Sequence, residues 1–265
     1  MIFDSHAHYD DEAFDEDRED LLAHMKEKGI GTIVNVGASM ESTARSVELA
    51  HRYENVYASV GVHPSETYEL TEQDMLILEK YITDKKVVAV GEIGLDYHYP
   101  DTDRELQEKW FTRQLDIAVK TNMPVIIHSR DAAGDTMDIL KKYQGKLAGG
   151  VIHCYSYSAD MAKEYVKMGY YIGIGGVLTF KNAKKLKETA KEVPIEKIVL
   201  ETDCPYLSPE PNRGMRNDST NIKYVVKVLS DIKGMSEEEI ENITYENAIR
   251  LYGIKRFGME KIWRF

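Results

Sequence analysis

The sequence predicts an α/β fold, a (β/α)8 TIM barrel, on three observations. Eight short runs rich in Val, Ile and Leu are spaced along the chain, and segments with helical spacing of apolar residues lie between them. The length of 265 residues is close to the size of about 250 that is usual for this fold. Continuous apolar runs are typical of strands buried on both faces, so we expect a parallel sheet covered by helices.

The expected strands follow one another from the N-terminus and are separated by the helical segments. Their ranges are 2–5, 31–36, 56–61, 87–92, 125–128, 150–153, 171–175 and 198–201. Strand and helix therefore alternate eight times, which predicts that the parallel sheet closes into a barrel.

The helices are predicted from apolar residues that recur at the spacing of one helix face. Such residues cluster around Leu21 and Met25, Val47 and Ala50, Met75 and Tyr81, and Trp110 and Ala118. Two more helices are expected at 221–232 and 236–252. In the second of these, Ser236 followed by Glu239 has the spacing of a capping box.

We expect a single domain over residues 1–265, because no stretch of the chain has the composition of a linker. No apolar run approaches the roughly 18 residues that span a membrane, and no signal peptide is recognisable. Cys154 and Cys204 are interpreted as small buried residues with reduced thiols, which favours a cytoplasmic protein. The tail 255–265 is expected to form a helix against the outside of the barrel, with stacking on nucleic acid as the alternative.

The first expected strand ends in a His-x-His pair, His6 and His8. Side chains two residues apart on a strand point to the same face, so the two imidazoles converge on one point. Two neutral imidazoles can chelate a divalent cation. Taken alone, the pair is equally consistent with two polar residues that simply end a strand.

Four later strands end in the same way, and this repetition favours a metal site. Each of them is followed or ended by a residue that can bind a metal: Glu92, His128, His153, and the pair Glu201 and Asp203. The carboxyl ends of all strands meet at one face of a TIM barrel, where the active sites of such enzymes lie. We therefore predict a metal centre at this face.

The net charge of −11 disfavours extended binding to duplex nucleic acid, which normally leaves a basic stripe. The acidic run from Asp10 to Asp20 is interpreted as a solvated loop that leads into a helix. Arg213 and Arg216 lie in a late loop at the expected barrel mouth. They could clamp a phosphate, or they could be two solvated surface arginines.

Six motifs, taken in order, resemble the TatD family of metal-dependent deoxyribonucleases: FDSHAH, GVHP, VGEIGLDY, PVIIHSR, GVIHCYS and LETDCPYL. The resemblance implies two divalent metals, the first held by His6, His8, Glu92 and Asp203, and the second by Glu92, His128 and His153. It also implies that Glu92 bridges them and that His63 lies near the scissile phosphate. The chain has Asp218 and Ser219 where the family commonly has Glu-Pro, so the shape of the arginine loop is expected to differ.

The chemistry of the same residues is consistent with this resemblance. Four histidines and two carboxylates exceed the three protein ligands that one catalytic zinc usually takes. Two cations roughly 3.5–4 Å apart lower the pKa of a shared water, which provides hydroxide near neutral pH. Asp203 is placed to hold a metal and to act as general base, while Glu201 is expected to hydrogen-bond a ligand histidine. The ligand types do not distinguish Mg, Mn, Zn or Co.

Three functions remain open at this point. The first is a phosphodiesterase that acts as an exonuclease on single-stranded or frayed DNA ends, with His63 and Arg213 or Arg216 as its few cations. The second is a hydrolase of a carbonyl substrate such as an aminoacyl ester or a cyclic amide. The third is a metal-binding scaffold without activity, which the acid–base residues beside the ligands argue against.

Overall fold

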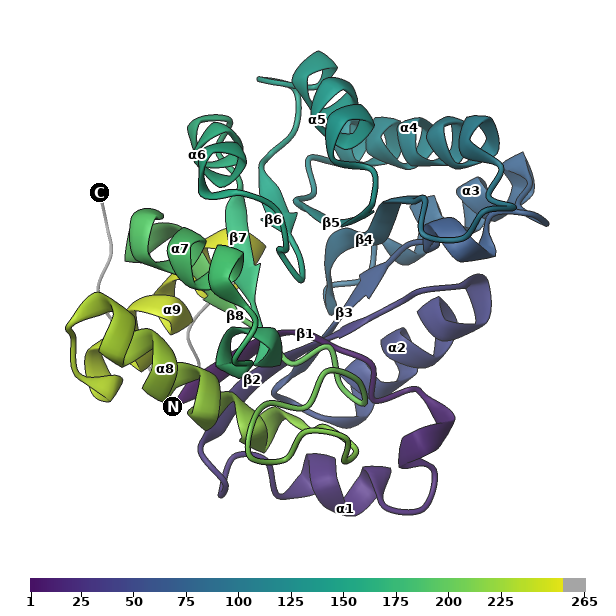
Figure 1. Cartoon of the computed structure of the whole chain (residues 1–265). Helices are drawn as coiled ribbons and strands as arrows, with labels where there is room; N and C mark the ends of the chain where they lie inside the picture. Colours follow the sequence, from purple (N-terminus) through teal and green to yellow (C-terminus); the bar gives the residue numbers. More distant parts are fainter. Residues whose placement is uncertain (255–265) are drawn as a thin grey trace, which may run out of the picture.

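The computed structural model describes residues 1–254 and confirms the predicted barrel of eight parallel strands (Figure 1). Each strand pairs with the next along the chain, in the order β1 to β8. The strands are β1 Ile2–Ala7, β2 Ile30–Val36, β3 Val56–Val60, β4 Val87–Asp96, β5 Val125–Arg130, β6 Gly150–Ile152, β7 Tyr171–Ile174 and β8 Ile198–Leu200. The predicted helix at 255–265 lies outside the described residues, and the single domain over 1–265 stays a prediction.

The helices surround the strands, as the sequence predicted (Figure 1). They are α1 Arg18–Ala23, α2 Met40–Arg52, α3 Glu72–Tyr81, α4 Arg104–Thr121, α5 Ala133–Lys142, α6 Ala159–Lys167, α7 Lys184–Glu192, α8 Ile222–Lys233 and α9 Glu237–Tyr252. The predicted capping box is confirmed: Ser236 precedes α9, and its side chain and that of Glu239 cap each other's backbone N–H groups. No helix in residues 1–254 is long and apolar enough to cross a membrane.

The strands are buried almost throughout because they are covered on both faces. All ten residues of β4 are buried, and so are all seven of β2. Helix α9 packs against strand side chains: Tyr245 and Tyr252 contact the ring of Phe3, and the Tyr252 hydroxyl donates to the Ser5 carbonyl at 2.8 Å. This contact connects the C-terminal part of the described chain to the first strand.

The ends of β1 and β8 meet through backbone hydrogen bonds between residues 6–8 and 202–204, a pair of segments we call the seam. The Asp203 N–H donates to the His6 carbonyl at 2.9 Å, and the His8 N–H donates to the Cys204 carbonyl at 2.9 Å. Because β1 carries the His-x-His pair, the seam brings the first metal-binding motif of the sequence beside the last one.

Candidate metal centre

A cavity of about 710 Å³ opens at the carboxyl ends of the strands, the face at which the sequence predicted a site. Its lining includes six residues that the sequence singled out: His8, His63, Glu92, His128, His153 and Asp203. His6 lies behind them, with only 1% of its surface exposed. The predicted metal-binding side chains are thus all gathered at one place.

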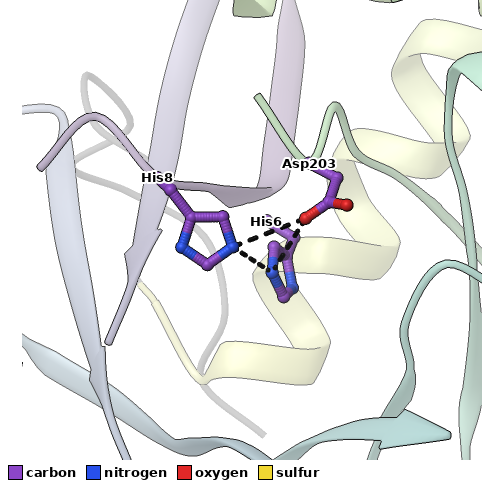
Figure 2. A group of neighbouring side chains, drawn as sticks. All are labelled: His6, His8 and Asp203. Atoms are coloured by element: carbon purple, nitrogen blue, oxygen red, sulfur yellow. Dashed lines mark hydrogen bonds and ion pairs between the residues drawn. The ribbon is translucent and has the colours of Figure 1, made fainter. Parts of the chain in front are cut away.

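His6, His8 and Asp203 form one cluster of facing atoms at the seam (Figure 2). The two Nε2 atoms of the histidines are 3.0 Å apart. Oδ1 of Asp203 lies 3.6 Å from Nε2 of His6 and 3.4 Å from Nε2 of His8. One cation placed among these atoms would be held by two imidazoles and one carboxylate, a donor set that suits a transition metal.

The other ring nitrogen of His8 determines which tautomer faces this cluster. Nδ1 of His8 lies 2.9 Å from the carbonyl oxygen of Val36, and a carbonyl can only accept, so Nδ1 carries the proton. In the neutral ring, Nε2 therefore presents a lone pair to Asp203 and His6. This is the form that a metal ligand requires.

Glu92 lies between this cluster and a second one, with a different carboxylate oxygen facing each. Oε2 is 3.4 Å from Nε2 of His6 and 3.8 Å from Nε2 of His8. Oε1 is 2.8 Å from Nδ1 of His128 and 2.9 Å from Nε2 of His153. A carboxylate in this position can contact two cations at once.

The charges of these groups favour a cation. Burial raises the pKa of Glu92, but His153 and His6 lower it by more, so that it lies well below its ordinary value and the carboxylate is ionised. Burial lowers the pKa of His8, but Asp203 and Glu92 raise it to about 9. This rise shows that the two carboxylates stabilise positive charge at the His8 imidazole. A bound divalent ion would be stabilised by the same carboxylates.

His6 differs from its neighbours because burial and His153 lower its pKa. It therefore stays neutral, as a metal-binding imidazole must. Three buried polar atoms around the clusters, Nδ1 of His6, Nδ1 of His153 and Oε2 of Glu201, have no hydrogen-bond partner within residues 1–254. The atoms that converge in the clusters are the Nε2 atoms of His6 and His153, so these Nδ1 atoms are not the ones that a metal there would contact. The fit to metal ions rests on the converging imidazole and carboxylate donors.

Glu201 was expected to hydrogen-bond a ligand histidine, and it lies next to His153. Its Oε1 accepts the backbone N–H of Cys154 at 2.6 Å and is 3.7 Å from Nδ1 of His153, beyond hydrogen-bond distance. Gly173 makes room for the carboxylate, because a Cβ there would come within 2.4 Å of Oε2. Glu201 therefore places a carboxylate near Nδ1 of His153 without forming a direct hydrogen bond to it.

His63 lies at the same cavity, but its tautomer is the opposite of that of His8. The backbone N–H of Ser65 donates to Nδ1 of His63 at 3.1 Å, so the proton of the neutral ring is on Nε2. Burial and His128 lower the pKa of His63 to about 3. In this structure the ring is therefore a neutral N–H donor, with Nε2 3.9 Å from Oε1 of Glu92, and not the cation that the sequence led us to expect; its place near the scissile phosphate stays a prediction.

The two arginines expected to bind substrate lie outside the lining of this cavity and differ from each other. Arg216 is paired with Asp17 and lies over the ring of Phe14. Arg213 lies over the ring of Phe180 and has no carboxylate partner within the described chain. The arginine that lines the cavity is Arg130, at the exposed end of β5.

Sequence reasoning missed two carboxylates at the site. Asp96 ends β4 and its Oδ2 is 3.2 Å from Nε2 of His128. Asp10 was assigned to a solvated run, but it is 7% exposed, lines the cavity and accepts hydrogen bonds from Asn35 and Ser42. Every second side chain of a strand points to the same face, so Glu92 and Asp96, four residues apart, are expected on one face. This spacing could have identified Asp96 from the sequence.

Another buried carboxylate, that of Asp4, forms hydrogen bonds with both segments of the seam. It accepts hydrogen bonds from the side chains of Thr202 at 2.7 Å and Ser219 at 2.6 Å, and from the backbone N–H groups of His6 and Thr202. Burial raises the pKa of Asp4 to about 7, against the effect of these hydrogen bonds. Ser219, one of the two residues at which the arginine loop was expected to differ, thus supplies a hydroxyl that a proline would lack.

Comparisons with known proteins identify relatives of nearly the whole chain. The profile of the family described as TatD related DNase matches residues 3–253. A metal-dependent hydrolase of Bacillus subtilis, YabD, is 42% identical over 96% of this chain and all of its own length. A Cronobacter sakazakii protein named 3'-5' ssDNA/RNA exonuclease TatD is 30% identical over 95% of this chain and 97% of its own. The crystal structure of the TatD homologue YJJV from Escherichia coli has a TM-score of 0.91 and 31% identity, and covers 96% of this chain and 98% of that one.

Proposed function

The chain belongs to the TatD-related DNase family of metal-dependent hydrolases, and from this premise we propose that it is a deoxyribonuclease that hydrolyses phosphodiester bonds at DNA ends. One observation carries the proposal: the two carboxylate oxygens of Glu92 face two separate groups of histidines. Such an arrangement suits two divalent cations. His6, His8, Glu92 and Asp203 would hold one, and Glu92, His128 and His153 the other.

Two bound cations would activate a water molecule and neutralise charge that develops on phosphate oxygens. The residues of the chain then have distinct tasks. Asp203, whose carboxylate is ionised because His8 and other histidines outweigh burial and lower its pKa, can accept the proton of the attacking water. His63 directs Nε2–H into the cavity and can donate it to a phosphate oxygen. Arg130, which lines the cavity, supplies positive charge there, while Arg213 lies outside the lining, over the ring of Phe180.

A short contact with a DNA end is consistent with the acidic surface of the protein. A chain with net charge −11 is poorly suited to bind DNA through a long row of basic residues. An exonuclease acts at a chain end and therefore needs few phosphate contacts. The name of the Cronobacter sakazakii relative supports single strands as the substrate. Residence in the cytoplasm is part of the proposal and is supported by the free thiols of Cys154 and Cys204.

The test compares three substrates after the chelated protein has been resupplied with Mg, Mn, Co or Zn. End-labelled single-stranded DNA should be shortened from one end, and bis-p-nitrophenyl phosphate should be hydrolysed faster than p-nitrophenyl acetate. Blunt duplex DNA should be degraded more slowly than the single strand. Hydrolysis of the acetate or of an aminoacyl ester without any cleavage of DNA would replace the proposal by a carbonyl hydrolase.

A further inference from the structure

A second hollow of about 190 Å³ adjoins the metal centre, between the segment after β3 and the segment after β4. It shares Ser65, Asp96 and Tyr99 with the lining of the larger cavity, so the two spaces lie side by side. A substrate held at the metal centre could therefore extend into this hollow. Its lining holds none of the residues that would bind a metal, but it includes Asp96, whose Oδ2 lies 3.2 Å from Nε2 of His128.

Two tyrosines line the hollow and are unusually open to solvent. Tyr68 is 65% exposed and Tyr99 is 63% exposed, although large aromatic side chains are mostly buried in folded proteins. The Tyr68 hydroxyl donates to the backbone carbonyl of Asp101 at 3.3 Å, so the two segments are connected across the hollow. The tyrosines thus offer exposed ring surface next to a catalytic cavity.

The charge around the hollow disfavours a phosphate as its occupant. Asp96, Asp101 and Asp103 are among the lining residues, and no Lys, Arg or His belongs to the lining. A phosphate would be repelled here. A nucleobase carries no charge, stacks on aromatic rings, and has exocyclic amino groups that carboxylates accept.

The floor of the hollow is rigid. Oε1 of Gln107 accepts the backbone N–H of Asp96 at 2.9 Å, and its Nε2 donates to the Pro64 carbonyl at 3.2 Å. This amide therefore holds the end of β4 against the segment after β3. These hydrogen bonds hold that part of the hollow in place before any ligand enters, which reduces the entropic cost of binding.

We propose that this hollow binds the nucleobase next to the scissile phosphodiester, through stacking on Tyr68 and Tyr99. The proposal rests on the proposed nuclease function and names the part of the substrate that the metal centre does not contact. It makes an unpaired base a requirement, because a base within a duplex is stacked on its neighbours and cannot enter. Preference for single strands or frayed ends follows from it.

The experiment uses the metal-loaded protein and single-stranded oligonucleotides in which one nucleotide at a time is replaced by an abasic residue. At one position near the cleaved end, loss of the base should raise KM about fivefold to a hundredfold, the range expected for stacking of one base on an aromatic side chain. Tyr68→Ala and Tyr99→Ala should raise KM for the intact strand and abolish the difference between intact and abasic strands. Tyr68→Phe and Tyr99→Phe keep the rings and should keep the difference.

Leu76→Ala is the matched control, since Leu76 is also an exposed large side chain, at 55%, but does not line the hollow. It should discriminate between intact and abasic strands as the native protein does. Absence of any DNA cleavage would overturn the nuclease function itself. Cleavage with equal KM for every abasic position, or with tyrosine variants that still discriminate, would overturn the base site alone. If the tyrosine variants instead affect only hydrolysis of an aminoacyl ester, the hollow binds an ammonium group and the base site is wrong.

Discussion

The backbone N–H of Asp203 donates to the carbonyl of His6 at 2.9 Å, and this hydrogen bond belongs both to the closure of the barrel and to the metal centre. The side chains of the same residues face each other across 3.6 Å. The strand that begins the chain and the segment that follows the last strand must therefore pair before the first cluster exists. For this reason, we expect changes at the seam to affect stability and metal affinity together.

Ser219→Ala tests the support behind the seam. The change removes a hydroxyl that donates to the buried carboxylate of Asp4 at 2.6 Å, so the free energy of unfolding should fall by about 1–3 kcal/mol. Denaturant unfolding of the metal-free protein measures this effect. Ser156→Ala, at an exposed serine, should change it by less than about 0.5 kcal/mol. Equal effects of the two changes would contradict a supporting role for Ser219.

The number of metal ions is predicted from Glu92. Purified protein should bind two divalent ions per chain, because each carboxylate oxygen of Glu92 faces its own group of histidines. Elemental analysis and titration calorimetry after chelation measure the number. His8→Ala should lower it, whereas His63→Ala should not, since the Ser65 N–H leaves the proton of His63 on the nitrogen that faces the cavity. Saturation at one ion, or loss of an ion in His63→Ala, would contradict these assignments.

Asp203 and Glu201 are predicted to differ in their effect on turnover. Asp203→Asn removes a charged ligand and the proton acceptor, so kcat should fall about 10²–10⁴-fold. Glu201→Gln removes negative charge behind His153 without touching the reacting atoms, and should cost about 10–100-fold, mainly through weaker metal binding. Steady-state kinetics at saturating metal distinguish the two variants, because excess metal should restore the activity of Glu201→Gln but not that of Asp203→Asn. If excess metal restored the activity of both variants, Asp203 would not be the proton acceptor.

Arg130 is predicted to bind substrate, whereas Arg216 is predicted to stabilise its loop. Arg130→Ala should raise KM for a single-stranded oligonucleotide about tenfold or more, because it loses a charge-assisted hydrogen bond to phosphate. The slope of log KM against log salt should fall by roughly 0.7, the contribution of one phosphate contact on a single strand. Arg216→Ala should change KM less, since its guanidinium is already paired with Asp17. A larger increase in KM for Arg216→Ala than for Arg130→Ala would contradict these roles.

Much of the fold could be predicted from the sequence because its signals are local. Apolar runs such as 87–92 and 198–201 identify strands buried on both faces, and the barrel follows from their alternation with helices. The observed ends of some strands differ from the predicted ones. Strand β1 continues to Ala7, beyond the predicted end at residue 5, and β8 ends at Leu200, one residue before the predicted end. Since strands of a barrel all end at one face, the residues that follow them were correctly predicted to meet there.

The barrel and the metal-binding side chains at its mouth could therefore be predicted from the sequence, because both follow from the alternation of side chains along strands and from the order of the elements. The roles of those side chains, and their neighbours Asp10, Asp96 and Arg130, depend on tertiary contacts. The tautomer of His63 depends on Ser65, the pairing of Arg216 depends on Asp17, and the burial of Asp10 depends on Asn35 and Ser42. The contacts of Arg216 and Asp10 result from how loops pack, and a loop's path depends on distant segments that leave no periodic signal in the sequence. The contact of His63 with Ser65 is local, but it depends on the turn at Pro64–Glu66, which periodicity does not describe.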